Sequence, residues 1–240
     1  MNLPRTLKVI AFDADDTLWD CQPWFDNVER QYCEILGEWG SMEYIHEELF
    51  KTEMANMDEL GYGSKAFTLS LIENAIRVSK GCVTAEQIMD IERLGRSLLR
   101  LPATPLPGVE ATLAQLRADG RYVLVLFTKG DTQEQLGKLR RSGLAQYFHR
   151  TEIVDDKRIG AFRELCEKLG ISAHEMLMVG NSFKSDVEPM LQLGGWALHV
   201  PYEVTWAHEQ TEEYEHPRLR VIDQFADIPR LLGTDQATDL

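Results

Sequence analysis

A short apolar run that stops at a cluster of acidic residues is the feature of this sequence that most limits how the chain can fold. Residues 8–19 read KVIAFDADDTLW, in which Asp13, Asp15 and Asp16 follow the apolar residues. Such a run, bounded by polar residues, is typical of a buried strand, and acids at its carboxyl end face the crevice where open α/β sheets bind ligands. Carboxylates this close repel one another unless a cation or a shared proton compensates their charge. The pattern therefore predicts a metal site at the end of a buried strand.

The spacing of Asp13 and Asp15 suits phosphoryl chemistry. One residue separates them, so both carboxylates and the nearby backbone carbonyls can face one cavity where the strand turns into a loop. Oxygen ligands of this kind favour Mg²⁺, which takes one or two carboxylates and leaves its other positions to water and phosphate. One carboxylate can attack phosphorus while the other exchanges a proton with the leaving group. A lone Asp after a strand is commonly a cap or turn residue, and we assign that role to Asp16.

From Gly108 onward, helical and strand-like patterns alternate, which predicts right-handed crossovers and a parallel sheet. The fold class is therefore α/β, with a doubly wound, Rossmann-like parallel sheet. The expected elements are a helix to Asp119, a strand to Phe127, a helix over 132–141, a strand over 151–154, a helix to Leu169, a strand to Val179, a helix to Leu193 and a strand over 196–200. An edge strand at 219–222, a closing helix at 228–232 and a flexible tail over 233–240 follow.

An inserted helical block separates the first strand from the rest of the sheet. Apolar residues recur at three- and four-residue intervals between the first motif and about Leu101, which is typical of amphipathic helices. Three prolines between Pro102 and Gly108 then return the chain to the sheet. We therefore expect an α/β core made of residues 1–21 and 104–232, with a helical domain over 22–103.

The motif Asp13-x-Asp15-x-Thr17 after an apolar strand resembles the first motif of the haloacid dehalogenase-like hydrolase superfamily. Candidates for the three later motifs of this family follow in order. Thr128 ends the apolar strand over 122–127, Lys157 lies at the start of an amphipathic helix, and an acidic loop after the strand over 176–179 carries Asn181 and Asp186.

Two positions depart from the family's pattern. Arg158 follows Lys157 where Pro is usual, which makes Arg158 a rival for the phosphate-binding cation. Asn181 replaces the usual metal-binding Asp, so a neutral carbonyl oxygen remains but one negative charge is lost, and metal affinity should fall. Asp186 can restore this charge by direct ligation, through water, or by pairing with Lys157. Ser182 or Ser185 can alternatively serve only to cap the following helix.

The resemblance implies a magnesium-dependent phosphomonoester hydrolase that acts on a small phosphorylated metabolite. Asp13 would form an aspartyl-phosphate and Asp15 would serve as the general acid and base. Thr128 and Lys157 would neutralise and orient the phosphoryl group, and Lys129 would also bind substrate. The metal site would contain Asp13, Asp15, Asn181 and Asp186.

In this family an insertion after the first motif is a mobile cap that selects the substrate. The resemblance therefore implies that the helical block is a cap, and Trp24 and Phe25, just beyond the motif, are our candidates for substrate contacts. The alternatives are a catalytically weak module that binds a phospho-ligand or a partner protein, which Asn181 favours, and a phosphomutase that keeps water from its intermediate. The aromatic segment over 196–208 can form a subunit contact, a cover for the sheet edge or a pocket wall.

Composition excludes several other classes of protein. The net charge of −14 argues against broad nucleic-acid affinity, so a phosphate site must be positive only locally. No apolar run is long enough to span a bilayer, and no basic segment with an apolar stretch opens the chain, which disfavours a membrane anchor or secretory signal. Four widely spaced cysteines suit free thiols in a reducing cytoplasm. We expect a cytoplasmic monomer or homodimer.

Overall fold

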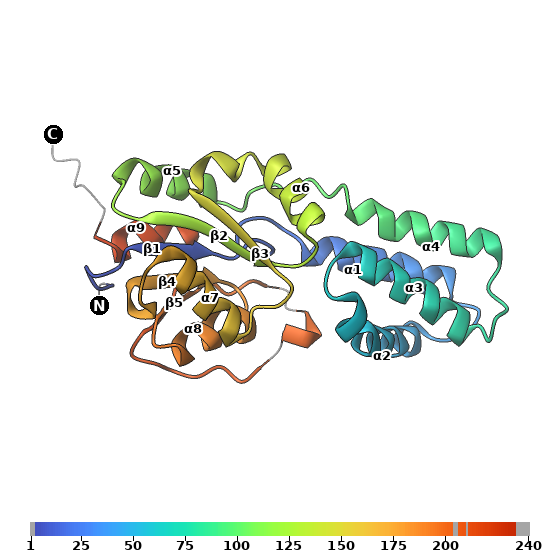
Figure 1. Ribbon diagram of the computed structural model, residues 1–240. Helices are drawn as coiled ribbons and strands as arrows, with labels where there is room; N and C mark the ends of the chain where they lie inside the picture. The colour runs from blue at the N-terminus through green and yellow to red at the C-terminus, as the bar shows by residue number, and fades with distance from the viewer. Residues whose placement is uncertain (1–2, 204–205, 210, 234–240) are drawn as a thin grey trace. The chain divides into compact units, whose positions relative to one another are not determined.

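The computed structural model describes residues 3–203, 206–209 and 211–233, which form two compact units (Figure 1). Of these described residues, the first unit contains 3–20, 103–129 and those from 139 onward, and the second contains 21–102 and 130–138. The predicted flexible tail, apart from Gly233, lies outside the described residues. Each unit is built around a separate apolar core.

The first unit is organised around a six-stranded sheet whose strands are all parallel. The strands are β1 (Val9–Phe12), β2 (Val123–Lys129), β3 (Arg150–Val154), β4 (Met176–Gly180), β5 (Trp196–His199) and β6 (Leu219–Val221). Their order across the sheet is β3-β2-β1-β4-β5-β6. The chain thus winds outward from β1 in one direction and then in the other, and it reverses at β1 and β4.

Helices cover both faces of this sheet. The α-helices of the first unit are α5 (Val109–Asp119), α7 (Ile159–Leu169), α8 (Glu188–Gln192) and α9 (Ile228–Leu231). The helix α6 (Thr132–Ser142) is shared, because its residues up to Lys138 belong to the second unit and its last residues to the first. On one face, Val9 and Ala11 share a buried cluster with Phe162 of α7 and Met190 of α8. On the other face, the ring of Phe12 lies 5.8 Å from that of Phe225, just before α9. The predicted doubly wound parallel sheet is therefore confirmed.

The reason β1 lies at the centre of the sheet is its composition. Its four residues are all apolar, so the strand can be buried on both faces, and all four are buried in the structure. Val9 and Phe12 pair with Val123 and Leu126 of β2 on one side and with Met176 and Val179 of β4 on the other. This register brings the carboxyl ends of β1, β2 and β4 to the same edge of the sheet.

Short irregular turns complete the first unit. They are η1 (Leu144–Tyr147), η2 (Ala173–Glu175), η3 (Phe183–Val187), η4 (Ala207–Glu209) and η5 (Phe225–Asp227). The sequence pattern predicts one helix up to Leu193 after β4, but the structure begins this segment with η3, a wide turn of π type, and continues with α8. Ser182 caps the wide turn by accepting a hydrogen bond from the Ser185 amide (3.0 Å), so Ser182 is the capping serine.

The second unit is a helical domain inserted between β1 and β2. It consists of α1 (Gln22–Ile35), α2 (Met42–Leu60), α3 (Ser64–Val78), α4 (Ala85–Leu98) and the first turns of α6. Its core contains a polar link, because Asn74 donates to the Tyr32 hydroxyl (2.8 Å), which donates to the Leu71 carbonyl (3.0 Å). No helix within the described part of the chain combines the length and the apolar character needed to cross a membrane.

The start of α6 belongs to the helical unit because it is bonded to α3. The Glu134 carboxylate accepts hydrogen bonds from the Ser64 amide (2.9 Å) and the Ser64 hydroxyl (2.6 Å), which caps the amino end of α3. Lys65 forms an ion pair with Asp131 (2.8 Å). Lys138 lies 3.5 Å from Glu134, and both side chains are almost completely buried. A short part of the chain after β2 is thereby fixed to the inserted helices.

Candidate active site

Polar side chains gather where β1, β2 and β4 end. Asp13 directly follows β1, Thr128 and Lys129 close β2, and Asn181 directly follows β4. Because the three strands are parallel neighbours, these residues lie at one edge of the sheet, at the point where the strand order reverses. The predicted motif residues Asp13, Thr128 and Asn181 thus come from three adjacent strand ends.

Lys157 lies between two of the predicted acidic residues. Its ammonium group donates to Asp13 Oδ1 and to Asp186 Oδ1, the latter at 2.6 Å, and its side chain is almost completely buried. Arg158 instead bonds to Asp156 at 2.7 Å, with its side chain 82% exposed. The structure therefore brings Lys157, and not Arg158, to the carboxylates.

Burial and charge act in opposite directions on this cluster. Burial, together with the negative charges of Asp186 and Asp15, raises the pKa of Asp13 to about 7 against the attraction and hydrogen bond of Lys157. Burial tends to lower the pKa of Lys157, but the attraction of the two carboxylates outweighs it and raises that pKa above its ordinary value. The ammonium therefore remains charged and compensates the repulsion between Asp13 and Asp186.

Asp15 is oriented by the indole of Trp19. Trp19 Nε1 donates to Asp15 Oδ1 at 2.7 Å, and the Trp19 side chain is fully buried. Asp16 adopts a left-handed conformation with φ of 60°, and its amide donates to the Trp19 carbonyl at 2.8 Å. The tight turn at Asp16 is what carries the chain back so that Trp19 can reach Asp15. Asp16 thus occupies a turn position, which agrees with the cap or turn role predicted for it.

The Asn181 amide lies against the loop that follows β1. One terminal atom of this amide lies 3.2 Å from Asp13 Oδ2, 3.2 Å from the Asp15 carbonyl and 3.0 Å from Thr17 Oγ1. With its nitrogen toward these oxygens, the amide has all three as acceptors within reach of its two N–H groups. With its oxygen toward them, it places a third hard ligand beside Asp13 and the Asp15 carbonyl.

These oxygens fit a small hard cation. Adjacent ligands of an octahedral Mg²⁺ lie about 3 Å apart, given metal–oxygen bonds of about 2.1 Å, and the Asn181 amide lies 3.2 Å from each of the other two oxygens. Among the residues that the structure describes, no three His, Cys, Asp or Glu side chains cluster as metal ligands. At this place the neutral Asn181 amide lies beside Asp13, and Lys157 binds both Asp13 and Asp186.

Gly180 is required by close packing at this point. A Cβ atom built on Gly180 would lie 2.1 Å from Asp186 Oδ2, a distance that no real Cβ contact shows. The absence of a side chain lets Asp186 fold back against the end of β4, where its Oδ2 accepts a hydrogen bond from the Ser182 amide (3.0 Å). Asp186 is completely buried as a result.

The two residues that close β2 differ in their surroundings. Thr128 is buried, and among the described residues its hydroxyl has one contact, a long one of 3.4 Å with the Lys129 carbonyl that is near the limit for a hydrogen bond. Lys129 forms an ion pair with Glu209 and donates to Ser185 Oγ at 3.0 Å. The predicted substrate-binding Lys129 is therefore already held by neighbouring polar side chains.

Trp24 and Phe25 lie on α1 in the helical unit. Trp24 is 41% exposed, whereas Phe25 packs at the edge of that unit's core with its ring 5.2 Å from the ring of Phe67. Of the two, Trp24 is the side chain that offers an exposed apolar surface.

Thr17, His199 and Glu209 also reach this site, although their residue types and spacing predict no role for them. The hydroxyl of Thr17, which is part of the first motif, accepts a hydrogen bond from the backbone N–H of Asn181 (3.0 Å) and donates one to Asp13 Oδ2 (3.2 Å). His199 at the end of β5 donates from Nε2 to the Asn181 carbonyl (3.0 Å). Glu209 contacts Lys129. Thr17 belongs to the first motif, and His199 lies in the aromatic segment for which a pocket wall is one of the expectations. Glu209 follows that segment directly, and no pattern in the sequence points to its contact with Lys129.

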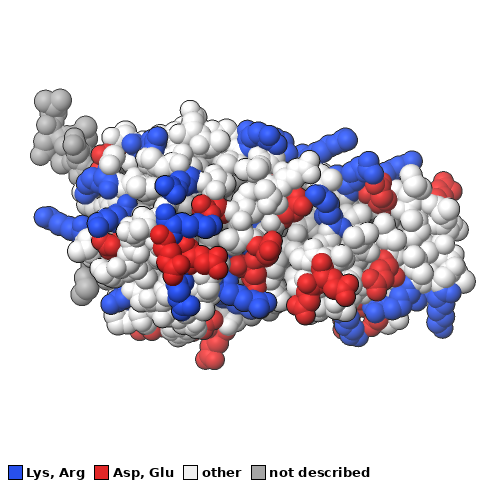
Figure 2. Space-filling model, in the orientation of Figure 1, with Lys and Arg blue, Asp and Glu red and all other residues white. Residues whose placement is uncertain are grey.

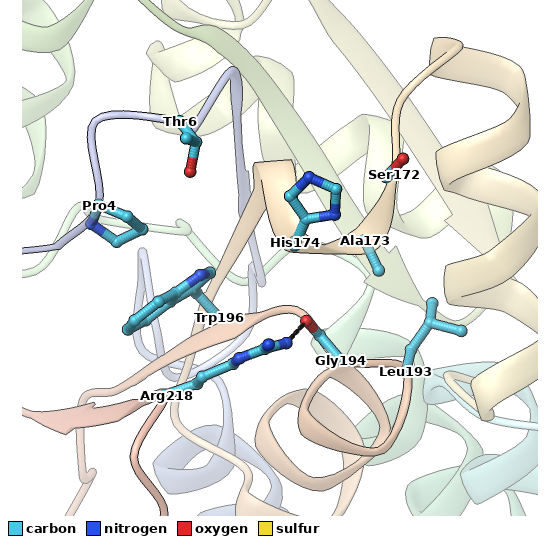
Figure 3. A pocket seen from close by; sticks show the side chains of 9 residues that line it. All are labelled: Pro4, Thr6, Ser172, Ala173, His174, Leu193, Gly194, Trp196 and Arg218. Atoms are coloured by element: carbon cyan, nitrogen blue, oxygen red, sulfur yellow. Dashed lines mark hydrogen bonds between the residues drawn. The ribbon is translucent and has the colours of Figure 1, made fainter.

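A separate hollow lies at the opposite edge of the sheet (Figure 3). Its volume is about 580 Å³. It is lined by residues that precede β1, β4 and β6 or begin β5, among them Thr6, His174, Trp196 and Arg218. Because it lies at the amino ends of parallel strands, it is distinct from the acidic cluster at their carboxyl ends.

Surface charge on the face drawn in Figure 2 is mixed, with Lys and Arg side chains interspersed among Asp and Glu. The net charge of the chain is −14. Within this negative protein, the buried ammonium of Lys157 is a positive charge that is paired with the carboxylates of Asp13 and Asp186.

Comparisons with known proteins agree with this geometry. The model of the haloacid dehalogenase-like hydrolase family matches residues 7–194. The glyceraldehyde 3-phosphate phosphatase of Methanothermobacter thermautotrophicus is 26% identical over 233 residues, which cover 94% of this chain and 100% of the relative. The phosphoglycolate phosphatase of Vibrio cholerae is 26% identical over 205 residues, which cover 82% of this chain and 86% of the relative. A crystal structure of a haloacid dehalogenase-like family hydrolase from Xanthomonas campestris has a TM-score of 0.86 and 32% identity, and the match covers 95% of this chain and 91% of that one.

Proposed function

The chain belongs to the haloacid dehalogenase-like hydrolase family and is a phosphatase, and on this premise we propose that it hydrolyses small phosphomonoesters through a phosphorylated Asp13. The observation that carries the proposal is the shared contact of Lys157 with Asp13 and Asp186. A carboxylate at a strand end, with a buried ammonium beside it, is suited to attack a phosphate while the positive charge compensates the developing negative charge.

In the first step, an Asp13 oxygen forms a bond to phosphorus as the bond from phosphorus to the substrate oxygen breaks. Asp15 donates its proton to that departing oxygen, so the product leaves as an alcohol. The hydrogen bond from Trp19 holds the Asp15 carboxyl in a fixed orientation for this transfer.

In the second step, Asp15 accepts a proton from water as the water oxygen bonds to phosphorus. The bond between phosphorus and Asp13 breaks, and inorganic phosphate is released. Lys157 and the Thr128 hydroxyl bind the phosphoryl oxygens in both steps, because Lys157 contacts Asp13 and Thr128 closes β2, the strand that pairs with β1. A dehalogenase needs no second acid, since a halide leaves without a proton, and the oriented Asp15 therefore favours phosphate ester hydrolysis.

Magnesium is the cofactor that the ligand set supports best. The Asp13 carboxylate, the Asp15 carbonyl and the Asn181 amide oxygen would hold it, with Asp186 acting directly or through water. When bound, Mg²⁺ would neutralise charge on the phosphoryl group and help to orient it. Asn181 supplies one charge less than an aspartate, so we expect weak magnesium binding.

The names of the relatives suggest which substrates to test. Proteins similar to this chain are named for glyceraldehyde 3-phosphate and phosphoglycolate, and we propose a phosphorylated metabolite of similar size as the substrate. We further propose that the helical unit acts as a cap that selects it. Trp24 on α1 is the primary candidate for a substrate contact, and Phe25 is the second.

The test is an assay of the purified protein on p-nitrophenyl phosphate and both metabolites, with Mg²⁺ or with EDTA. We expect turnover with Mg²⁺, loss in EDTA, and loss on Asp13→Asn. Turnover that survives Asp13→Asn would exclude Asp13 as the nucleophile. The neutral Asn181 favours a second candidate, a phosphate-binding module of low activity, which binding of the metabolites without release of inorganic phosphate would support. Isomerised product without released phosphate would indicate a phosphomutase.

A further inference from the structure

The carboxylate of Glu209 is the meeting point of three donors. Glu209 lies in η4 and accepts hydrogen bonds from the hydroxyls of Ser182 and Ser185, the latter at 2.6 Å, and it forms an ion pair with Lys129. Its side chain is only 11% exposed. Lys184 adds a further bond to η4 by donating to the His208 carbonyl at 2.7 Å. This short turn is thus attached to the loop after β4 at several points.

A continuous path of hydrogen bonds leads from Glu209 to Asp13. Glu209 binds the Ser182 hydroxyl, and the Ser182 amide donates to Asp186 Oδ2 at 3.0 Å. The other Asp186 oxygen accepts from Lys157, which also donates to Asp13. All of these residues belong to the sheet unit. A shift of Glu209 would therefore act on the groups that surround the proposed nucleophile.

The arrangement has an electrostatic reason as well. Lys129 follows Thr128 at the end of β2, and its charge is neutralised by Glu209. Burial alone would raise the pKa of Glu209, but the charge and hydrogen bond of Lys129 and the two serine hydroxyls outweigh it and hold that pKa at about 2. The carboxylate thus remains an acceptor throughout the neutral range. Its loss would leave Lys129 and two buried hydroxyls without this partner, which is costly in a partly buried place.

From these contacts we infer that Glu209 is a positioning residue of the phosphatase site, which holds the loop over 181–186 and Lys129 in the arrangement that hydrolysis needs. The inference deepens the proposed function and rests on it. Glu209 touches none of the proposed reacting atoms and acts through Ser182, Ser185 and Lys129. Partners of this outer kind typically change metal affinity or activity by about 10- to 100-fold when they are removed.

The test compares Glu209→Gln with Glu212→Gln, because Glu212 is an exposed residue of the same segment. For Glu209→Gln we expect kcat on p-nitrophenyl phosphate to fall by about 10-fold or more with KM nearly unchanged, and calorimetric Mg²⁺ affinity to fall several-fold. We also expect faster amide hydrogen exchange in a peptide that covers residues 181–190, measured without substrate or metal. Glu212→Gln should match the wild type in each measurement. Equal kcat, Mg²⁺ affinity and exchange in the two variants would overturn the inference.

Two further measurements separate the possible explanations. A cycle of Lys129→Met, Glu209→Gln and the double variant should show non-additive effects on kcat, because the two residues act together; additive effects would overturn the pairing.

If Glu209→Gln does not fold, Ser182→Ala and Ser185→Ala each remove one contact, and an unchanged kcat in both would overturn the inference. If the wild type releases no phosphate from any substrate, the proposed function fails, and the exchange of residues 181–190 still decides whether Glu209 holds the loop.

Discussion

Lys157 Nζ lies 2.6 Å from Asp186 Oδ1 while it also donates to Asp13. The ammonium therefore serves two carboxylates that come from different strand ends, and its positive charge offsets the repulsion between them. A buried pair of acids without a counter-charge would be strongly unfavourable.

Replacing Lys157 should change both catalysis and the response to magnesium. We expect Lys157→Met to lower kcat by about 100-fold or more, because a donor to the phosphoryl group is lost. The freed carboxylates should then depend more on Mg²⁺, so the rise in melting temperature on adding Mg²⁺ should exceed that of the wild type. Scanning calorimetry with MgCl₂ and with EDTA measures this rise, and Arg158→Met is the matched control. An equal rise in the variant and the wild type would contradict the prediction.

Restoring an acid at position 181 should strengthen the metal site. Asn181→Asp adds a negative charge beside Asp13, 3.2 Å from its Oδ2 in the present structure, and we expect Mg²⁺ to bind about 10-fold more tightly. In EDTA the same variant should melt at a lower temperature than the wild type, because the like charges repel. Titration calorimetry and thermal melts provide the two measurements. Unchanged affinity would mean that this amide does not lie at the metal site.

The loss of activity on replacing Asp15 should depend on the leaving group of the substrate. We expect Asp15→Asn to reduce hydrolysis of an alkyl phosphate much more than that of p-nitrophenyl phosphate, because p-nitrophenolate leaves without protonation. Trp19→Phe removes the 2.7 Å hydrogen bond to Asp15 together with part of the buried indole ring, and leaves the Asp15 carboxyl in place. It should give a smaller loss, again larger for the alkyl phosphate than for p-nitrophenyl phosphate. The ratio of kcat/KM for the two substrates is the readout. An unchanged ratio in Asp15→Asn would exclude Asp15 as the general acid.

A methyl group at position 180 should disturb Asp186. Gly180→Ala places a Cβ atom 2.1 Å from Asp186 Oδ2, so this carboxylate or the loop must move. We expect kcat to fall by about 10- to 100-fold. Gly160→Ala in α7 is the control, since nothing lies within 4 Å of its added Cβ, and it should be neutral or stabilising. Similar kcat values for both variants would show that Asp186 need not keep its place.

Glu53 in the helical unit should make stability depend on pH. Burial, with a smaller contribution from the charge of Glu29, raises the pKa of Glu53 from 4.5 to about 8. The folded state therefore holds the Glu53 proton more tightly than the unfolded chain does. The protonated Glu53 contributes its full stabilising effect below pH 4.5, and this contribution is lost as the pH rises through about 8.

Glu53→Gln should remove this loss of stability. We expect the variant to exceed the wild type by roughly 1–3 kcal/mol in unfolding free energy at pH 8, with little difference near pH 4.5. Urea unfolding at the two pH values tests this, with the exposed Glu59→Gln as the control. A difference that does not vary with pH would contradict the raised pKa.

The positions of the strand ends follow from local patterns in the sequence. Apolar runs before Asp13 and Thr128 and before the Gly180-Asn181 pair predict buried strands, because a strand covered on both faces must be apolar. Parallel pairing then places their carboxyl ends at one edge of the sheet. The alternation of helices and strands, and therefore the fold class, depends on the same short-range periodicity.

Such patterns predict the conformation of loops less well. The wide turn η3 replaces the expected regular helix because Asp186 bonds to the Ser182 amide and Ser182 bonds to the Ser185 amide. These bonds form only when Asp186 can pack against Gly180, which is a matter of three-dimensional fit.

The sequence by itself determined the parallel α/β sheet, the helical insertion and the acidic strand end, since each depends on residues close together in the chain. Only the tertiary structure decided between Lys157 and Arg158, placed the Asn181 amide against Asp13, and brought His199 and Glu209 to the loop that carries Asp186. Neighbouring residues in a loop can point in opposite directions, and contacts between distant segments form only when the whole sheet is assembled. Their energies come from burial and hydrogen-bond geometry, which residue type and spacing do not specify.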